Sequence, residues 1–420
     1  MTKPLRVAIV GAGPAACTLA SLLAQRGWQP VVFDDGRRPE MLVGESLIPA
    51  VVPLLRRLEI EERVAAVSQY KPGVSLLHDQ SAAIHFNFAP VAPWLPTYAY
   101  NVDRRTFDAL LKVRAAELGA EFIPRRAGVI RGAPGSGREL ELDVASLAAA
   151  PSLHGRQPDL LVDATGRTRH FARLLEIGAD RGPREDMAYF AHYDNFQLPE
   201  PHGQVLINRL SGHGWSWRIP LRDKMSFGIV VPREAAGLLG TTAEERLENV
   251  MHGEPLLCEA ARDARRISPA AMYANYQLLS HRSHGPGWVA AGDSFGFVDP
   301  MLSSGLFLAM EGAARLDAAL AAGHGLQAYD AHMREWYRAW ARLIAYFYDG
   351  RLFSLAEAGH QARTKRPNVT PGWIDRMVNK HIACMSAGAL TRSFRSWCVL
   401  RAASHLLVWG VSPPAQLAIR

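Results

Sequence analysis

Residues 5–35 read LRVAIVGAGPAACTLASLLAQRGWQPVVFDD and contain the first regular structure that the sequence predicts. The apolar run 5–10 predicts a buried strand, and apolar residues spaced three or four apart between 16 and 23 predict a helix. The run 31–33 predicts a second strand. A strand, a Gly-rich turn, a helix and a strand in this order are typical of an α/β dinucleotide-binding fold.

The turn fits the pattern GxGxx[G/A] through its small residues Gly11, Gly13, Ala15 and Ala16. Gly11 permits the tight turn, Gly13 lets the backbone approach a pyrophosphate, and Ala16 lets the helix pack closely on the strand. Asp34 ends the second strand, where an acidic residue accepts hydrogen bonds from ribose hydroxyls. The alternative for Asp34 is a solvated turn. We predict nucleotide binding at this turn.

Composition limits the class of protein. A chain of 420 residues has the length of about three domains. Its 48% apolar and 21% charged residues exclude wholesale disorder. The 47 Lys and Arg residues against 40 Asp and Glu residues give a net charge of +7. This excess does not establish nucleic-acid binding, and we expect none, but it favours an acidic ligand or partner.

The cysteines and the apolar segments indicate the compartment. The four cysteines have no CxxC spacing, so we predict neither a zinc site nor a disulfide framework, and a reducing compartment. No HExxH or comparable histidine cluster predicts a metal site either. The apolar run 7–24 is interrupted by two glycines and a proline, and no other uncharged apolar segment is 18 residues long. We expect a cytoplasmic protein without a membrane span.

A β-rich region interrupts the nucleotide-binding elements. Residues 186–232 are rich in β-forming residues and predict antiparallel strands in a separate layer. The other expected elements are a helix over 45–66 that is broken near its prolines, strands within 74–100, a helix over 104–118 capped by Asp103, strands at 160–163 and 288–291, helices over 242–264 and 304–322, and a largely helical last ninety residues.

Two later segments extend the pattern of the N-terminal turn. Together with that turn, Asp163–Arg167 and Gly292–Pro300 resemble the flavoprotein monooxygenase superfamily of the para-hydroxybenzoate hydroxylase fold. The resemblance implies that FAD is the cofactor and that Asp293 holds its ribityl or ribose hydroxyls. It also implies that a helix opens at the flavin pyrimidine ring. The later cofactor-binding residues that it implies are Arg104, Asp163, Gly166, Gly292, Asp293, Pro300 and Gly305. The alternative for Arg104 is an exposed residue in the first turn of its helix.

The same resemblance implies a discontinuous domain arrangement in an α/β fold. We expect a GR2-type FAD-binding Rossmann-like domain, an inserted antiparallel β-sheet substrate domain and a C-terminal helical region. The expected FAD-binding domain comprises residues 1–75, 101–185 and 276–330. Residues 76–100 and 186–275 form the expected substrate domain, and 331–420 form a helical cap.

Four segments are similar to those of the flavin-dependent halogenases within this superfamily. Gly44–Pro49, which contains Glu45 and Ser46, matches GESxxP, and Trp215–Pro220 fits WxWxIP. The resemblance places Lys71 at the lysine that relays hypohalous acid, and Ser304 and Gly305 in the halide-side loop. It implies that Trp215 and Trp217 form a wall between substrate and flavin, and that Glu45 and Ser46 line the substrate cavity with them. The alternative for the tryptophans is one face of a core strand.

Some features depart from the halogenase pattern. The chain is short, Ser294 and Leu302 replace the usual residues, and the C-terminal region is basic. The basic residues are Arg363, Lys365, Arg366, Arg376, Lys380, Arg392, Arg395 and Arg401. Because a basic rim suits an acidic macromolecular substrate, our main hypothesis is hydroxylation of an electron-rich aromatic. One such substrate is a protein-bound tryptophan in tryptophylquinone maturation.

Two alternatives stay open: a flavin-dependent halogenase of a small pyrrole, phenol or indole, and a flavoprotein-like maturation or binding factor without turnover. In the resemblance, reduced FAD and O2 form a flavin C4a-hydroperoxide that transfers oxygen or oxidises halide. No second GxGxxG pattern is present. The electron source is therefore NAD(P)H bound directly or a separate flavin reductase. The expected partners are an aromatic substrate, which includes an acidic peptide or protein, and that reductase.

Overall fold

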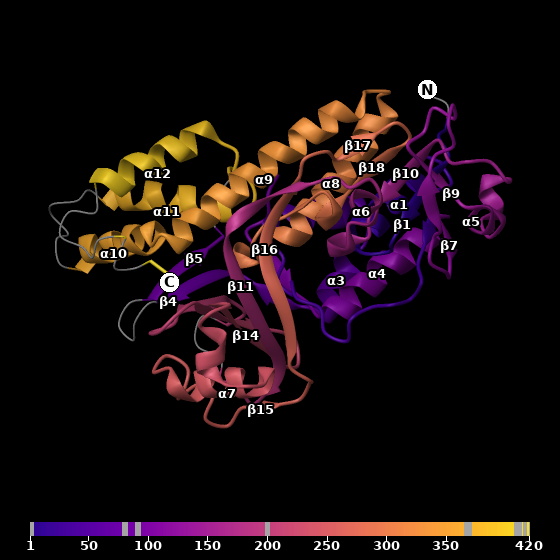
Figure 1. Cartoon of the computed structure of the whole chain (residues 1–420). Coiled ribbons are helices and arrows are strands. Elements are labelled where there is room, and N and C mark those ends of the chain that lie inside the picture. Colours follow the sequence, from indigo (N-terminus) through magenta and orange to yellow (C-terminus); the bar gives the residue numbers. More distant parts are fainter. Residues whose placement is uncertain are drawn as a thin grey trace.

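A six-stranded sheet carries the N-terminal unit. The computed structural model describes residues 4–77, 83–88, 94–197, 202–364, 372–406, 414 and 418–419 (Figure 1). The sheet has the order β17-β18-β10-β1-β2-β7, and only the β17–β18 pair is antiparallel. Its strands are β1 (Val7–Val10), β2 (Val31–Phe33), β7 (Glu121–Ile123), β10 (Leu160–Asp163), β17 (His284–Gly285) and β18 (Trp288–Ala290).

Three helices pack together beside this sheet, and its central strands β1 and β2 are apolar. The helices are α1 (Pro14–Gln25), α4 (Arg104–Glu117) and α8 (Ser304–Ala321), and α1 packs against both of the others. All residues of β1 and β2 are buried, as expected for parallel strands covered on both faces. Asp103 caps α4 by accepting hydrogen bonds from the backbone N–H groups of Arg105 and Thr106. The expected α/β fold is confirmed.

A second, nine-stranded sheet is mostly antiparallel. Its order is β19-β16-β11-β14-β13-β12-β4-β5, with β15 beside β11. Its strands are β4 (Gly73–Leu77), β5 (Ala83–Asn87), β11 (Ala179–Asp194), β12 (Val205–Arg209), β13 (Trp215–Pro220), β14 (Met225–Pro232), β15 (Arg265–Arg266), β16 (Ala271–Ser280) and β19 (Gly296–Phe297). One face adds to the main core, and the other packs with α7 (Ala243–Gly253) around a second core.

The remaining elements frame these two sheets. Two small strand pairs are β3 (Gln69–Lys71) with β6 (Ala99–Asn101) and β8 (Val129–Arg131) with β9 (Leu140–Leu142). The shorter helices are α2 (Val52–Arg57), α3 (Glu61–Val67), α5 (Val144–Ala148) and α6 (His170–Leu174). The C-terminal helices are α9 (Leu326–Tyr348), α10 (Arg351–Thr364), α11 (Gly372–Ser386) and α12 (Phe394–Leu406).

Strands β11 and β16 are the longest link between the two sheets (Figure 1). They pair with each other and cross the expected boundaries at 185/186 and 275/276. The expected division into domains therefore stays a proposal. No helix in the described ranges has both the length and the apolarity needed to cross a bilayer.

Two expected helices differ from the structure. The helix expected over 45–66 begins only at Pro49, because Gly44 has a φ of +96° and Ser46 forms a β-bridge with Asn101. The helix expected over 242–264 ends at Gly253, since Pro255 disfavours helical backbone at Glu254. The first difference matters for function, because it leaves the GESxxP segment extended.

Trp217 packs on a cross-strand glycine, and this contact gives a stability prediction. A Cβ atom at Gly228 would overlap the Trp217 ring. We expect Gly228→Val to lower the free energy of unfolding by about 1–3 kcal/mol, because the ring must leave its rotamer. Urea denaturation measures this change. Gly237→Ala is the control, since no atom lies within 4 Å of its Cβ position. Equal midpoints for both variants would contradict the packing described.

Candidate functional site

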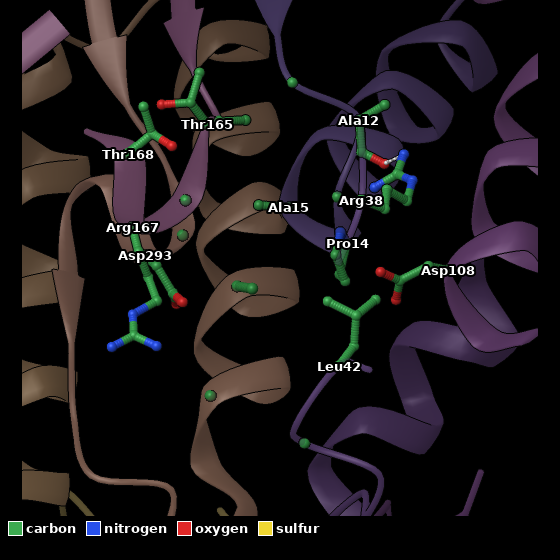
Figure 2. Close-up of a pocket in the computed structure, with 18 of the residues that line it drawn as sticks. Ala12, Pro14, Ala15, Arg38, Leu42, Asp108, Thr165, Arg167, Thr168 and Asp293 are labelled. Atoms are coloured by element: carbon green, nitrogen blue, oxygen red, sulfur yellow. Dashed lines mark hydrogen bonds between the residues drawn. The ribbon is translucent and has the colours of Figure 1, made fainter. Parts of the chain in front are cut away.

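A cavity of about 690 Å³ lies at the carboxyl ends of β1 and β10 (Figure 2). This is the edge at which open α/β sheets bind ligands. Its walls come from segments that are distant in sequence: the turn after β1, residues 34–46, the start of α4, residues 164–168, and residues 291–309. Its volume lies within the range of cofactor sites.

The two glycines of the first turn have different roles. Gly11 has a φ of +100°, and a Cβ atom there would lie 2.5 Å from the carbonyl oxygen of Ala164. At Gly13, by contrast, a Cβ atom would meet no protein atom within 4 Å. Gly13 precedes α1, and no side chain caps that helix. The helix N-terminus therefore faces open space in the cavity, which fits a pyrophosphate.

The alanines of this turn lie on either side of the helix. Ala15 lines the cavity, whereas Ala16 is fully buried and does not. Ala16 therefore acts only through helix packing.

Asp34 lines the cavity, but cationic groups surround it. Its carboxylate accepts hydrogen bonds from Lys112 Nζ at 2.7 Å and from the backbone N–H of Gly36, and Arg38 lies at 3.4 Å. Burial alone would raise the pKa of Asp34, but these hydrogen bonds hold it below its ordinary value. Asp34 is buried, so the solvated-turn alternative is wrong. Ribose hydroxyls that donate to Asp34 would therefore share its carboxylate with Lys112 and the backbone N–H of Gly36.

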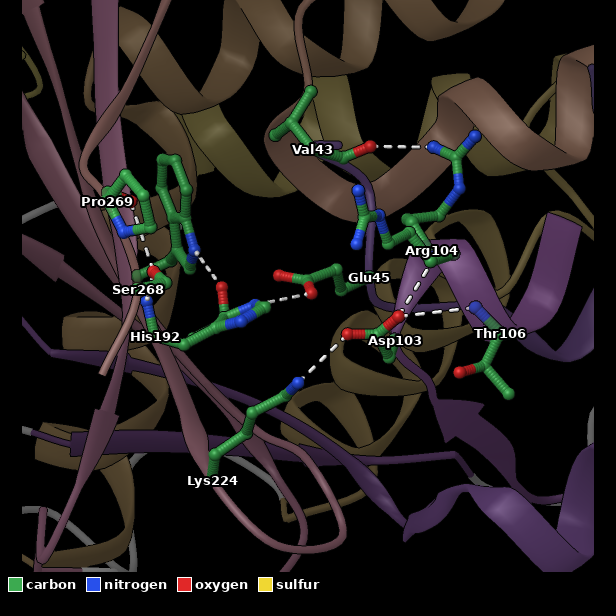
Figure 3. Close-up of polar contacts among 12 residues, drawn as sticks. Val43, Glu45, Asp103, Arg104, Thr106, His192, Lys224, Ser268 and Pro269 are labelled. Atoms are coloured by element: carbon green, nitrogen blue, oxygen red, sulfur yellow. Dashed lines mark hydrogen bonds and ion pairs between the residues drawn. The ribbon is translucent and has the colours of Figure 1, made fainter. Parts of the chain in front are cut away.

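Arg104 joins the start of α4 to the segment before GESxxP. Its guanidinium donates to both oxygens of Asp108 at 3.1 and 3.2 Å. It also donates to the carbonyl oxygen of Val43 at 2.6 Å (Figure 3). Its side chain is 14% exposed and lines the cavity. The exposed alternative for Arg104 is therefore wrong.

Asp163 holds the second wall of the cavity in place without lining it. Its Oδ1 accepts hydrogen bonds from the backbone N–H and hydroxyl of Thr165 and from Ser294 Oγ, and its Oδ2 accepts from the Phe171 N–H. The carboxylate is thus occupied by protein donors, and the predicted cofactor contact of Asp163 is corrected to a positioning role. Ser294, which departs from the family pattern, contributes one of these bonds. Gly166, with a φ of +61°, does line the cavity.

Asp293 lines the cavity beside Arg167 (Figure 2). Its carboxylate accepts no hydrogen bond from any described residue. Burial raises the pKa of Asp293 to about 6, although Arg167 and Arg104 partly oppose this shift. Gly292 before it has a φ of +61°, and a Cβ atom there would lie 3.0 Å from Ala15. A desolvated acceptor that lacks protein donors fits the hydroxyl groups of FAD.

The start of α8 closes the far end of the cavity. Pro300, Ser303 and Gly305 line it, and Leu302 and Ser303 have φ angles of 64° and 59°. Such left-handed residues cost about 1 kcal/mol or more each, which is typical of functional turns. Ser304 does not line the cavity, and its hydroxyl is buried without a partner among the described residues.

Lys71 is fully buried on β3, directly behind the cavity wall. Its Nζ donates hydrogen bonds to Ser46 Oγ at 2.8 Å and to the Leu47 carbonyl oxygen at 2.9 Å, and lies 5.4 Å from the Phe88 ring centroid. No carboxylate among the described residues pairs with it. Burial lowers the pKa of Lys71 to about 7. Ser46 lines the cavity and Lys71 does not, so Ser46 separates them.

Glu45 points away from Ser46, toward a cluster of charged groups. Its Oε1 lies 2.7 Å from His192 Nε2, and Asp103 pairs with Lys224 at 2.9 Å (Figure 3). The ligand atoms of Glu45, Asp103 and His192 lie within 4.8 Å of one another, a spacing that could hold a metal ion. The sequence did not predict this group, because its members are scattered along the chain. Since Lys224 already provides a cation beside Asp103, we assign no metal here.

The two signature tryptophans are buried on the face of β13 that adjoins α9. Trp215 Nε1 donates to the Tyr348 hydroxyl at 2.9 Å, and that hydroxyl donates to Asp299 Oδ2 at 2.8 Å. Trp217 Nε1 lies 3.3 Å from Ser226 Oγ. Neither tryptophan lines the 690 Å³ cavity. Tyr348 thus links the WxWxIP strand to the loop before α8, a role with no signal in the sequence.

The basic C-terminal residues are only partly available to a partner. Arg392 pairs with Glu335 at 2.5 Å and lies over the Trp336 ring, so it holds helices together. Lys365 and Arg366 lie outside the described residues. Lys380, Arg395 and Arg401 are exposed.

These features define an FAD-dependent oxidoreductase with an α/β cofactor domain. Residues 6–95 and 95–351 match the family described as "Tryptophan halogenase". The chain belongs to this family.

Individual relatives agree with the family. The chain is 28% identical over 373 residues to a tryptophan 2-halogenase of Chondromyces crocatus, covering 82% of this chain and 68% of the relative. It is 28% identical over 337 residues to a 1H-pyrrole-2-carbonyl-[peptidyl-carrier protein] chlorinase of Pseudomonas fluorescens, covering 73% of each. A variant of the flavin-dependent brominase Bmp2 has the same fold, with a TM-score of 0.74, 23% identity, and coverage of 96% and 98%. The matched region thus covers about two thirds to three quarters of the two curated relatives and nearly all of the Bmp2 chain.

The glycine turn yields a prediction about cofactor retention. We expect Gly13→Val to fold normally but purify with little or no FAD, because its side chain enters only open cavity space. Gly11→Val is the comparison and should instead lose stability, since its side chain meets Ala164 and its φ is left-handed. Flavin absorbance and thermal denaturation measure the two effects. A folded Gly13→Val protein with full flavin would contradict the role of the turn.

Asp293 yields a second retention prediction. Asp293→Ala removes the acceptor for FAD hydroxyls, worth roughly 1.5–3 kcal/mol, so FAD should bind about tenfold or more weakly. Fluorescence titration of the apoprotein measures this. Glu121→Ala serves as a control outside the cavity. Unchanged affinity in Asp293→Ala would remove Asp293 from the cofactor site.

Proposed function

We propose that this enzyme is a flavin-dependent halogenase of a small electron-rich aromatic ring. The observation that carries the proposal is Lys71, a buried ammonium that Ser46 and Leu47 hold against the cavity wall and that no carboxylate of the described residues pairs with. Burying a charge without a partner is costly, so such a residue usually has a chemical role. When bound in its reduced form, FAD would supply two electrons and O2 would take a further two from halide, so that reduced flavin, O2, halide and a proton give oxidised flavin, hypohalous acid and water.

Lys71 is suited to the second half of that reaction. Hypohalous acid and an aromatic C–H give a carbon–halogen bond and water, so the leaving oxygen must gain a proton and the ring must lose one. The Lys71 ammonium donates a hydrogen bond to that oxygen, and the neutral amine accepts the proton from the ring. A pKa of about 7 favours both directions of transfer near neutral pH.

The chain separates this site from the cofactor cavity. Ser46 stands between Lys71 and the cavity, and Trp215 is tied through Tyr348 to Asp299. An aromatic substrate beside Lys71 would therefore not touch the flavin, and a small oxidant would travel to it. This arrangement supports halogenation over direct hydroxylation, which requires the substrate to reach the flavin. No comparable observation supports hydroxylation of a protein-bound tryptophan. The mass-spectrometric experiment below distinguishes hydroxylation from halogenation.

The substrate class follows from charge and from relatives. One relative is a chlorinase of pyrrole-2-carbonyl groups carried on a peptidyl carrier protein. The exposed Lys380, Arg395 and Arg401 on α11 and α12 would attract an acidic carrier or peptide. We therefore propose a carrier-bound pyrrole as the first substrate to test. Because no second GxGxxG pattern is present, we also propose a separate flavin reductase as the electron source.

The reaction prediction uses Lys71→Met. With reduced FAD, O2 and bromide or chloride, the wild-type enzyme should add the mass of a halogen to the aromatic substrate. Lys71→Met should reduce this product by about a hundredfold or more while flavin oxidation continues. Mass spectrometry of the substrate gives the answer, with Lys380→Met as the exposed-lysine control. A product heavier by one oxygen in halide-free buffer would instead support the hydroxylase.

Lys71 also yields a stability prediction with a defined pH dependence. Its pKa is about 7 when folded and about 10.4 when unfolded, so the folded state pays a penalty that is complete below pH 7 and vanishes toward pH 10. We expect Lys71→Met to be more stable than wild type by about 1–3 kcal/mol at pH 6.5. The difference should shrink by pH 9.5. Urea denaturation at both values tests this, and a difference independent of pH would contradict the lowered pKa.

A further inference from the structure

A second buried cation lies on the opposite face of the tryptophan strand. Side chains alternate along β13, so Ser216 and Arg218 point away from the face that holds Trp215 and Trp217. Arg218 is 3% exposed. Its strand neighbours are Leu206 on β12 and Phe227 on β14, which offer no charge.

Arg218 is not neutralised by any residue that the structure describes. Among the described residues, no carboxylate pairs with it, and its one hydrogen bond runs from Nη2 to Asn208 Oδ1 at 3.4 Å. Its Nε is buried without an acceptor. Burial lowers the pKa of Arg218 only to about 10, so the group stays charged at neutral pH.

Two further polar groups beside Arg218 are also unsatisfied. Asn208 Nδ2 and Ser216 Oγ are buried, and neither has a hydrogen-bond partner in the described part of the chain. Asn208 and Ser216 face each other across β12 and β13, and Arg218 follows two residues after Ser216 on the same face. One guanidinium, one amide and one hydroxyl therefore present hydrogen-bond donors at one place. Buried donors of this kind normally have an acceptor, and a cation among them calls for an anion.

We propose that Arg218, Asn208 and Ser216 bind one halide ion behind the tryptophan strand. A monovalent ion matches the single positive charge, and a weakly hydrated halide loses its water at lower cost than a multivalent oxyanion. A spherical anion can accept a hydrogen bond from each of the three donors, whatever the direction of the donor. The site is separate from the cofactor cavity, none of whose lining residues it contains. It does not rest on the proposed reaction.

The bound halide would brace β13 from the face opposite Trp215 and Trp217. The position of the tryptophans would then depend on halide concentration even when no turnover takes place.

Thermal denaturation of the oxidised FAD-loaded enzyme, without reductant, tests the site. We expect sodium bromide at 0.5 M to raise the melting temperature by about 2–4 °C above sodium gluconate at the same ionic strength. Arg218→Met should lose most of this increment. Arg246→Met is the matched control, because that arginine packs on the same sheet over Tyr189 and already donates to protein oxygens. Its bromide response should equal that of wild type.

A second variant keeps the test decisive if Arg218→Met does not fold. Asn208→Asp places a permanent carboxylate beside the guanidinium, so the protein should be more stable in gluconate and should no longer respond to bromide. Anomalous diffraction from bromide-soaked wild-type crystals should show an ion beside Arg218. Equal bromide responses in wild type and both variants, or only water beside Arg218, would overturn the proposal. Neither outcome depends on whether the enzyme halogenates.

Discussion

The close approach of Gly11 to the Ala164 carbonyl is the contact on which the cofactor site depends. It brings the turn after β1 against the turn after β10 at a distance that no side chain at position 11 would allow. The same approach aims the N-terminus of α1 at the cavity and sets Thr165 and Gly166 on its opposite wall. Asp163 then fixes this second wall through hydrogen bonds to Thr165 and Ser294.

The buried charged residues of this protein fall into two groups. Some are paired with protein groups and stabilise the fold, and others have no such partner among the described residues. Asp317 is fully buried, but Arg26 and Arg57 both pair with it, so it joins α1 and α2 to α8. Asp163 is likewise saturated by protein donors. Lys71, Asp293 and Arg218 lie at the other extreme, because each is largely enclosed and, among the described residues, has no oppositely charged partner in hydrogen-bond contact. Burying such a group without a partner lowers the stability of the folded state. We therefore infer that each of the three residues contacts a bound ligand or takes part in the reaction.

The long strands β11 and β16 explain how the substrate side and the cofactor side are held together. Both strands belong to the nine-stranded sheet, and their pairing runs across the boundaries expected between the cofactor and substrate domains. Tyr348 adds a direct link between Trp215 and the loop before α8. Changes behind the tryptophan strand can therefore reach the loop at the end of the cofactor cavity without a hinge between separate domains.

Local sequence determined the first unit, the β-rich insertion and the motifs, because strand and helix periodicity and glycine turns act over a few neighbouring residues. Lys71 could be singled out from its motif, but the sequence could not show that no carboxylate of the described residues pairs with it, since pairing depends on residues distant in sequence. For the same reason, the sequence did not predict that Glu45, Asp103 and His192 lie together or that Tyr348 links Trp215 to Asp299. Only tertiary structure decided that Asp163 turns away from the cavity while Asp293 faces it, because two acidic residues after similar strands differ only in which donors surround them.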